Sequence, residues 1–214
     1  EHSLNILSPD VLPSLVKQKG VKKWLTVTAP DYLGGKPICQ LVTHNASDLI
    51  GRTISLLLSE LTDDPSHTTV KIKFKVIGVR GETALTDFWG YELDRDFIRS
   101  LLRKGSSRVD RVFEAITKDG YKMRITVLAI TRYKASQTQK KKMRRAMMEI
   151  ILNKCSKLNY AQFVQELVFG KIESDLYNEA KKFHRIKLAG VKKMKMLEAP
   201  IRLEEVKASL AEAT

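Results

Sequence analysis

A strict alternation of apolar and basic residues from Val70 to Val76, at the start of a predicted strand that continues to Val79, constrains the fold more than any other stretch of this chain. The alternating residues are Val70, Lys71, Ile72, Lys73, Phe74, Lys75 and Val76. Side chains along a β-strand point to opposite faces in turn, so this pattern predicts a strand with one apolar face and one polar outer face. The chain must therefore contain a sheet in which this strand is paired.

Further strands are expected on both sides of this one. The segments Arg52–Leu61 and Thr83–Trp89 have the composition of strands. Two longer strands, Ser107–Thr117 and Tyr121–Tyr133, flank the pair Asp119-Gly120. A type I′ hairpin turn needs positive φ at both central residues, which Asp-Gly tolerates, so a hairpin is predicted here.

The hydrophobic period changes from two to about 3.6 at several points, and helices are expected there. Asp94–Lys104 is predicted as a helix that Asp94 caps and that Gly105 follows as the C′ residue. Ser136 and Gln139 fit a capping box at the start of a helix that continues to Lys154. Two more helices, at 160–169 and 172–183, precede a last strand at 185–196.

These elements together predict an α+β fold. An antiparallel β-rich body, either a curled sheet or a barrel, is followed by a three-helix lobe and a returning C-terminal strand. The expected divisions are an extended N-terminal arm at 1–36, the body at 37–135 with the inserted helix 94–104, the helical lobe with the final basic strand at 136–200, and a tail at 201–214.

The charge is unevenly distributed along the chain. Lys and Arg number 38 against 24 Asp and Glu, which gives a net charge of +14. The window from Tyr121 to Met148 has nine Lys or Arg and no acid, and the window from Ala180 to Leu197 has seven and no acid. The remainder of the chain is slightly acidic, so two concentrated basic segments predict a polyanionic partner such as nucleic acid.

The basic start of the helix after Ser136 is the most specific of these features. The cations there are Lys140, Lys141, Lys142, Arg144 and Arg145. They repel one another and the partial positive charge of the helix N-terminus. A phosphate backbone relieves this repulsion, which favours RNA binding over the alternative of a solvated charged face.

Other basic residues are candidates for the same role. In the strand 121–133, one face carries Lys122, Arg124, Arg132 and Lys134, interrupted by Leu128 and Ile130. The inserted helix carries Arg95, Arg99 and Arg103 on one face, where they bind phosphates or pair with nearby acids. The last strand carries Lys192, Lys193 and Lys195, which bind RNA or protect an edge strand from aggregation.

Aromatic side chains offer a second mode of RNA recognition, because they can stack on bases. The candidates are Trp24, Trp89, Tyr91 and Tyr133. Aromatic residues in a β-rich body belong more often to the core, and the sequence contains no aromatic strand typical of single-strand readers. Recognition of folded RNA by its shape and phosphates is the favoured interpretation.

No catalytic or metal motif is apparent in the sequence. The four histidines and two cysteines lack metal-ligand spacing, and the cysteines fit a reducing cytosol. Gly34-Gly35-Lys36 is followed by Pro37 where a phosphate loop has Ser or Thr, so it indicates a plain turn. No enzyme activity, cofactor or metal is expected, and the apolar runs are too short to span a bilayer.

Several stretches resemble, in order and spacing, one family of archaeal and eukaryotic small-subunit ribosomal proteins, the S-one-e family, formerly called S-three-A-e. The matching stretches are Lys23-Trp24, Ala29-Pro30, Leu49–Arg52, Val70–Phe74, Leu93–Leu102, Arg108–Asp110, Thr117–Lys122, Phe163–Lys171, Glu179–Lys182 and Glu198–Pro200. The resemblance covers roughly residues 22–200. The archaeal members are more similar, because the lysine-rich N-terminal tail of eukaryotic members is missing here.

The resemblance implies a structural constituent of the small ribosomal subunit, placed on the platform near the mRNA exit side and the 3′ region of the rRNA. The implied partners are small-subunit rRNA and neighbouring ribosomal proteins, with mRNA near the exit as a further candidate. Neither a membrane nor a second copy of the chain is expected as a partner, and the implied location is the cytoplasmic ribosome. The alternative is an RNA-processing or RNA-modifying enzyme with a basic RNA-binding surface.

Overall fold

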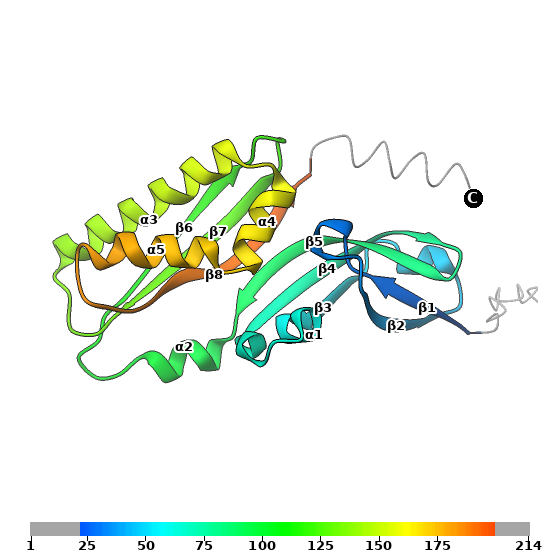
Figure 1. The fold of residues 1–214 in the computed structure, drawn as a ribbon, viewed down its shortest axis with the longest axis horizontal. Helices are drawn as coiled ribbons and strands as arrows, with labels where there is room; N and C mark the ends of the chain where they lie inside the picture. The colour runs from blue at the N-terminus through cyan, green and yellow to red at the C-terminus, as the bar shows by residue number, and fades with distance from the viewer. Residues whose placement is uncertain (1–21, 200–214) are drawn as a thin grey trace, which may run out of the picture.

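The computed structural model describes residues 22–199 and shows one branched sheet with helices on both of its faces (Figure 1). The alternating segment forms β4 (Val70–Arg80), and its burial alternates as the pattern predicts, with Ile72, Phe74 and Val76 buried. β4 pairs with β3 (Thr53–Leu57) on one edge and with β5 (Thr83–Leu93) on the other. The predicted α+β class is confirmed.

Strand β5 is the branch point of the sheet. One of its edges pairs with β4 along the length of the strand, whereas the other edge has two partners. The first three residues of β5 pair in parallel with β1 (Lys23–Thr28), and Gly90–Glu92 pair antiparallel with β8 (Ile186–Glu198). From β1 the sheet continues to β2 (Pro37–Thr43), and from β8 to β7 and β6. The sheet does not close, so the barrel is excluded and the open form is confirmed.

The predicted hairpin is β6 (Arg108–Ile116) and β7 (Lys122–Thr131), paired without interruption. Its turn is not type I′. Among the turn residues only Gly120 has positive φ, at 84°, and its N–H donates to the carbonyl oxygen of Thr117. The chain therefore makes an ordinary i to i+3 turn over Lys118 and Asp119 and uses glycine alone for the left-handed position.

Helices α3 (Gln137–Lys157), α4 (Tyr160–Val168) and α5 (Lys171–Lys181) form the predicted three-helix lobe. They cover one face of β6, β7 and β8 (Figure 1). The capping box of Ser136 and Gln139 is present, as predicted. The residues that face the sheet recur at helical spacing, and α3 contributes Met143, Met147, Ile151 and Cys155.

Helix α2 (Arg95–Leu101) packs on the opposite face of the sheet. It ends three residues earlier than predicted, and Gly105 lies in the following loop rather than at the C′ position. Phe97 of α2 lies close to Leu128 of β7 and Leu188 of β8, which line one small cavity with it. The sequence interruption at Leu128 and Ile130 is thereby explained: this end of β7 is covered by helices on both faces, so both faces are apolar.

The N-terminal strands enclose a second, smaller core of buried residues. Its members are Leu25, Val27, Leu49, Val76 and Ala84. The segment 52–61, predicted as one strand, is β3 followed by helix α1 (Leu58–Thr62), because Leu58 and Leu61 are buried at helical spacing. Short 3-10 turns lie at 31–33, 46–49 and 65–69. Residues 1–21 and the tail predicted at 201–214 lie outside the described residues.

Candidate nucleic-acid interface

The predicted cations lie on two separate surfaces of the structure. These two surfaces do not correspond to the two basic windows of the sequence. Neighbours in β7 alternate between faces: Met123 and Ile125 are buried against the helical lobe, whereas Arg124 between them is exposed on the other face. Helix α3, which continues the same basic segment of sequence, lies on the lobe side. The window 121–148 is therefore split between the two faces of the sheet.

We call the first basic region the sheet surface. It lies on the face of the sheet opposite α3, and cross-strand pairing brings its residues together. Its residues are Lys71, Lys73, Arg95, Arg99, Lys122, Arg124, Lys192, Lys193 and Lys195. The register places Lys195 opposite Arg124 on one side and opposite Gly90 on the other, and Gly90 is opposite Lys73. Three strands far apart in the sequence thus contribute to one row of cations.

The last strand is central in the sheet and not an edge. β8 pairs with β5 and with β7. Edge protection is therefore not the reason for its lysines, and that alternative is wrong. The pairing register shifts between Val191 and Lys193, so Lys192 is an extra residue in a bulge. After the bulge, Lys193 and Lys195 lie on one face of the strand.

Helix α2 borders the sheet surface and deepens it. Arg95 and Arg99 line a cleft of about 330 Å³ together with Lys192 and Lys193. They also line an adjoining cleft of about 500 Å³ with Lys71 and other residues of β3 to β5. The arginine helix and the last strand, predicted as independent candidates, therefore form one concave region. Arg103, the third predicted arginine of this helix, lies exposed in the loop after α2 and lines neither cleft.

Glu92 lies in the middle of the sheet surface and holds two of its lysines. Its carboxylate accepts hydrogen bonds from Lys73 at 3.0 Å and from Lys193 at 3.3 Å. Burial alone raises the pKa of this carboxyl group, but the two lysines lower the pKa below its ordinary value. Glu92 is therefore ionised at neutral pH and fixes the positions of both ammonium groups.

We call the second basic region the helix surface. It comprises the start of α3 and the loop before it. Its residues are Arg132, Lys134, Lys140, Lys141, Lys142, Arg144 and Arg145. The first turn of α3 contains no acid. Arg144 donates from Nε to the backbone carbonyl oxygen of Asp110 at 3.1 Å, which anchors the helix across β6.

Most of these cations have no anionic partner within residues 22–199. Those without an ion pair are Arg95, Arg103, Arg132, Lys134, Lys140, Lys141, Lys142, Arg144, Lys192 and Lys195. Some of the ion pairs that do exist, such as Arg124 with Glu114 at 2.8 Å and Arg145 with Glu149 at 3.0 Å, are exposed, whereas those of Glu92 are partly buried. Exposed pairs contribute only about 0–1 kcal/mol each, so these cations can still exchange a carboxylate for a phosphate.

Lys71 and Lys73 join the sheet surface although they were not among the predicted RNA-binding residues. The signal was present in the sequence, because the alternation at 70–79 places both on the polar face of β4. What the alternation could not show is that β8 and β7 continue that face across β5.

The four aromatic candidates lie in different surroundings. Trp24 and Tyr133 are exposed, whereas Tyr91 is buried with its hydroxyl donating to Glu173 at 2.9 Å. Trp89 is partly buried, and the ammonium group of Lys75 lies 4.3 Å from the centre of its ring.

Groups with raised pKa values belong mostly to structural contacts. Burial raises the pKa of Tyr32, Tyr91 and Tyr160, and each hydroxyl donates to a fixed acceptor on another element. Burial likewise raises the pKa of Cys155 to about 12. Among residues 22–199, no group of three or more His, Cys, Asp or Glu has an arrangement that could hold a metal ion, and no helix is long and apolar enough to cross a membrane.

Comparison with known protein families identifies the family of this chain. Residues 16–200 match the Ribosomal S3Ae family. The chain belongs to that family. The family predicted from the ordered stretches is therefore confirmed.

This S3Ae family member is similar over most of its length to proteins named small ribosomal subunit protein eS1. The protein of Pyrobaculum aerophilum is 41% identical over 196 residues, which cover 91% of this chain and 89% of that protein. The protein of Sulfurisphaera tokodaii is 39% identical over 84% of this chain and 93% of its own. That of Archaeoglobus fulgidus is 37% identical over 86% and 88%. These relatives are archaeal, as the resemblance predicted.

In this S3Ae family member, the stretches that resemble the family also contribute buried residues to the core. The run Leu93–Leu102 forms the end of β5 and all of α2, with Leu93 and Ile98 buried. The run Phe163–Lys171 supplies the buried face of α4 and the start of α5. The resemblance therefore includes residues of the core.

Proposed function

We propose that this chain is a structural component of the small ribosomal subunit that binds rRNA through the sheet surface and the helix surface. The observation that carries the proposal is the cation row of the sheet surface, assembled from β4, β8 and β7 and bordered by Arg95 and Arg99. A polyanion with closely spaced charges is the partner that such a row fits.

The family relationship supports the rest of the proposal. Its relatives are named small ribosomal subunit proteins, so neighbouring ribosomal proteins and rRNA are the proposed partners in the cytoplasmic ribosome. A place on the platform, near the mRNA exit side and the 3′ region of the rRNA, rests on the same resemblance. The role is structural, with catalysis by neither surface.

Fractionation of a cell extract on a sucrose gradient tests the assignment to the particle. The tagged full-length chain is expected to sediment with the small subunit and to leave it in a high-salt wash. Migration only at the top of the gradient at low salt contradicts a place in the particle. An RNA-modifying enzyme, the alternative, is expected to associate substoichiometrically and to alter RNA that it is incubated with.

Binding to purified small-subunit rRNA at increasing salt tests the contact model. The logarithm of affinity is expected to fall linearly with the logarithm of salt concentration, with a slope of about −0.7 to −0.9 per phosphate contacted. Replacing Arg95 and Lys192 by alanine is expected to make the slope shallower by about one for each lost contact. Arg80 and Lys118, exposed on hairpin turns, give a matched pair of alanine controls that leave the slope unchanged. An affinity insensitive to salt contradicts the phosphate contacts.

A further inference from the structure

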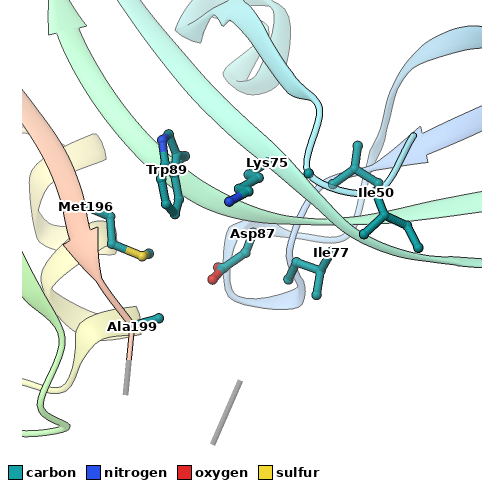
Figure 2. A pocket seen from close by; sticks show the side chains of 9 residues that line it. Ile50, Lys75, Ile77, Asp87, Trp89, Met196 and Ala199 are labelled. Carbon is teal, nitrogen blue, oxygen red and sulfur yellow. The ribbon is translucent and has the colours of Figure 1, made fainter. Parts of the chain in front are cut away.

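An apolar pocket of about 230 Å³ is lined by residues of β4, β5, the end of β8 and the turn before β3 (Figure 2). Trp89, Met196 and Ala199 stand on one side of it, and Ile50 and Ile77 on the other, with Lys75 and Asp87 between them (Figure 2). Ile50 is more than half exposed. The pocket therefore presents an aromatic ring and aliphatic walls to solvent beside a strongly basic region.

A bulge in β5 places Trp89 there. The register with β4 pairs Lys73 with Gly90 and Phe74 with Phe88, which leaves Trp89 without an opposite residue. Phe88 points into the core, stacked edge-on against Phe74. The indole of Trp89 lies under the ammonium group of Lys75, on the lysine-bearing face of β4.

The pocket is continuous with the sheet surface. Lys73 and Lys75 lie two residues apart on the same face of β4, and Lys75 lines the pocket. Gly90 lies between Lys73 and Lys195 and has no side chain, so nothing rises between these two lysines at that position. An RNA strand whose phosphates lie along the lysines therefore passes beside Trp89.

We propose that this pocket holds one unpaired nucleobase of the bound RNA, stacked on the indole of Trp89. The inference rests on the proposed function and adds a base-recognition site to its phosphate contacts. The position of Lys75 over the ring is compatible with this occupant. A cation–π contact at an exposed site is weaker than the stacking of a base on an indole, so a base can displace the ammonium group. The displaced ammonium remains close enough to bind the phosphate of the incoming nucleotide.

The chain offers a direct optical test, because it contains only two tryptophans, Trp24 and Trp89. Trp24→Phe, at an exposed position, leaves Trp89 as the single fluorophore. The variant is titrated with three RNA hairpins whose stems are closed by the same non-nucleotide linker: one with a single bulged adenosine, one with an abasic site in place of that adenosine, and one with a fully paired stem. All three are expected to bind at low salt. Only the bulged adenosine is expected to quench Trp89 fluorescence.

Binding of the same three hairpins by the Trp89→Ala variant is measured by electrophoretic mobility shift. The change in affinity gives the contribution of base stacking. Loss of base stacking is expected to weaken binding of the bulged hairpin by about tenfold or more and to leave the abasic hairpin unaffected. If all three hairpins bind and quench Trp89 fluorescence equally or not at all, the proposed base pocket is wrong and the phosphate contacts remain. The remaining occupant of the pocket is then an apolar side chain of a protein partner. If no hairpin binds at low salt, the proposed function fails as well. Circular dichroism of each variant confirms that it is folded.

Discussion

The phenolic hydroxyl of Tyr160, at the start of α4, donates a 2.6 Å hydrogen bond to the backbone carbonyl oxygen of Phe88 in β5. The N–H of the same Phe88 donates to the hydroxyl of Tyr32 at 3.2 Å. This edge of β5 has no neighbouring strand, because the pairing with β1 stops at Leu85 and the pairing with β8 starts at Gly90. Two tyrosine hydroxyls thus replace a strand at the branch point of the sheet.

Tyr160→Phe is expected to lower the free energy of unfolding by about 1–3 kcal/mol, because it leaves the buried carbonyl oxygen of Phe88 without a donor. The ring and its stacking on Tyr121 remain, so the loss isolates the hydroxyl. Urea unfolding followed by circular dichroism measures it. Tyr133→Phe, at an exposed ring, is the control and is expected to stay within about 0.5 kcal/mol of the wild type. Equal effects of the two substitutions contradict the role given to this hydrogen bond.

Gly90→Ala is expected to destabilise the protein by about 1–3 kcal/mol, because the added methyl group overpacks a fixed backbone. An added Cβ lies only 2.9 Å from the backbone carbonyl oxygen of Met194, and neither strand can move without disturbing the junction of β5 and β8. Gly190→Ala is the matched comparison. Its Cβ approaches the flexible side chain of Glu173 at 3.1 Å, so a smaller loss is expected. Thermal unfolding of both variants ranks them, and the reverse order contradicts the close approach at Gly90.

Glu173→Gln is expected to stabilise the protein at neutral pH and not at acidic pH. Burial raises the pKa of Glu173 above its ordinary value, although Tyr91 donates a hydrogen bond to its carboxylate and His67 is nearby. The folded state thus binds the proton more tightly than the unfolded state, and this stabilisation is present below the unfolded pKa and is lost as pH rises through the folded pKa. Glutamine keeps an acceptor for Tyr91 and carries no charge.

Urea unfolding of the wild type and of Glu173→Gln at pH 4, 5.5 and 7.5 measures the effect. The difference in unfolding free energy is expected to grow in favour of the glutamine variant as pH rises. A difference that is constant with pH shows that Glu173 ionises equally in both states.

Lys141→Glu combined with Arg145→Glu is expected to abolish stable association with the small subunit and to leave the fold intact. Both side chains are exposed on α3, so charge reversal there leaves the buried face of the helix unchanged, apart from the exposed ion pair of Arg145 with Glu149. Co-sedimentation of the variant with the particle measures association, and circular dichroism verifies folding. Arg80→Glu with Lys118→Glu changes the net charge equally at two hairpin turns and is expected to co-sediment normally. A Lys141 and Arg145 variant that still co-sediments shows that the helix surface is not a principal contact.

Local pattern was enough to predict most elements and their order. Val70–Val79, the hairpin around Asp119-Gly120 and the capping box at Ser136 each satisfy their requirements with near neighbours in the sequence. The errors arose where distant packing decides the outcome. The strand expected to reach Leu61 becomes helix at Leu58 because its leucines turn into the core, and α2 ends at Leu101, where Lys187 of β8 donates to its last carbonyl oxygen.

The candidate site divides in the same way. Which residues carry surplus charge was visible in the sequence, and so was the shared face of Lys122 and Arg124. Arg132 and Lys134, predicted on that same face, instead follow the end of β7 and belong to the helix surface. That Lys195 stands between Arg124 and Gly90 follows from strand pairing, and that Arg95 shares a cleft with Lys192 follows from helix packing. Both join segments that are far apart in the sequence. The sequence did not distinguish Trp89 from the other three aromatic candidates, because the bulge in β5 that places it at the pocket depends on pairing with β4.

By itself, the sequence determined the fold class and the excess of positive charge, because alternation, caps and composition act over a few residues and need no partner. The family followed from the ordered stretches that resemble it. Only the tertiary structure decided that the basic window 121–148 is divided between two faces, and that its strand half joins β4 and β8 in one surface. The physical reason is that a sheet separates neighbours in a strand and unites residues opposite one another, and the register that unites them is set by long-range packing.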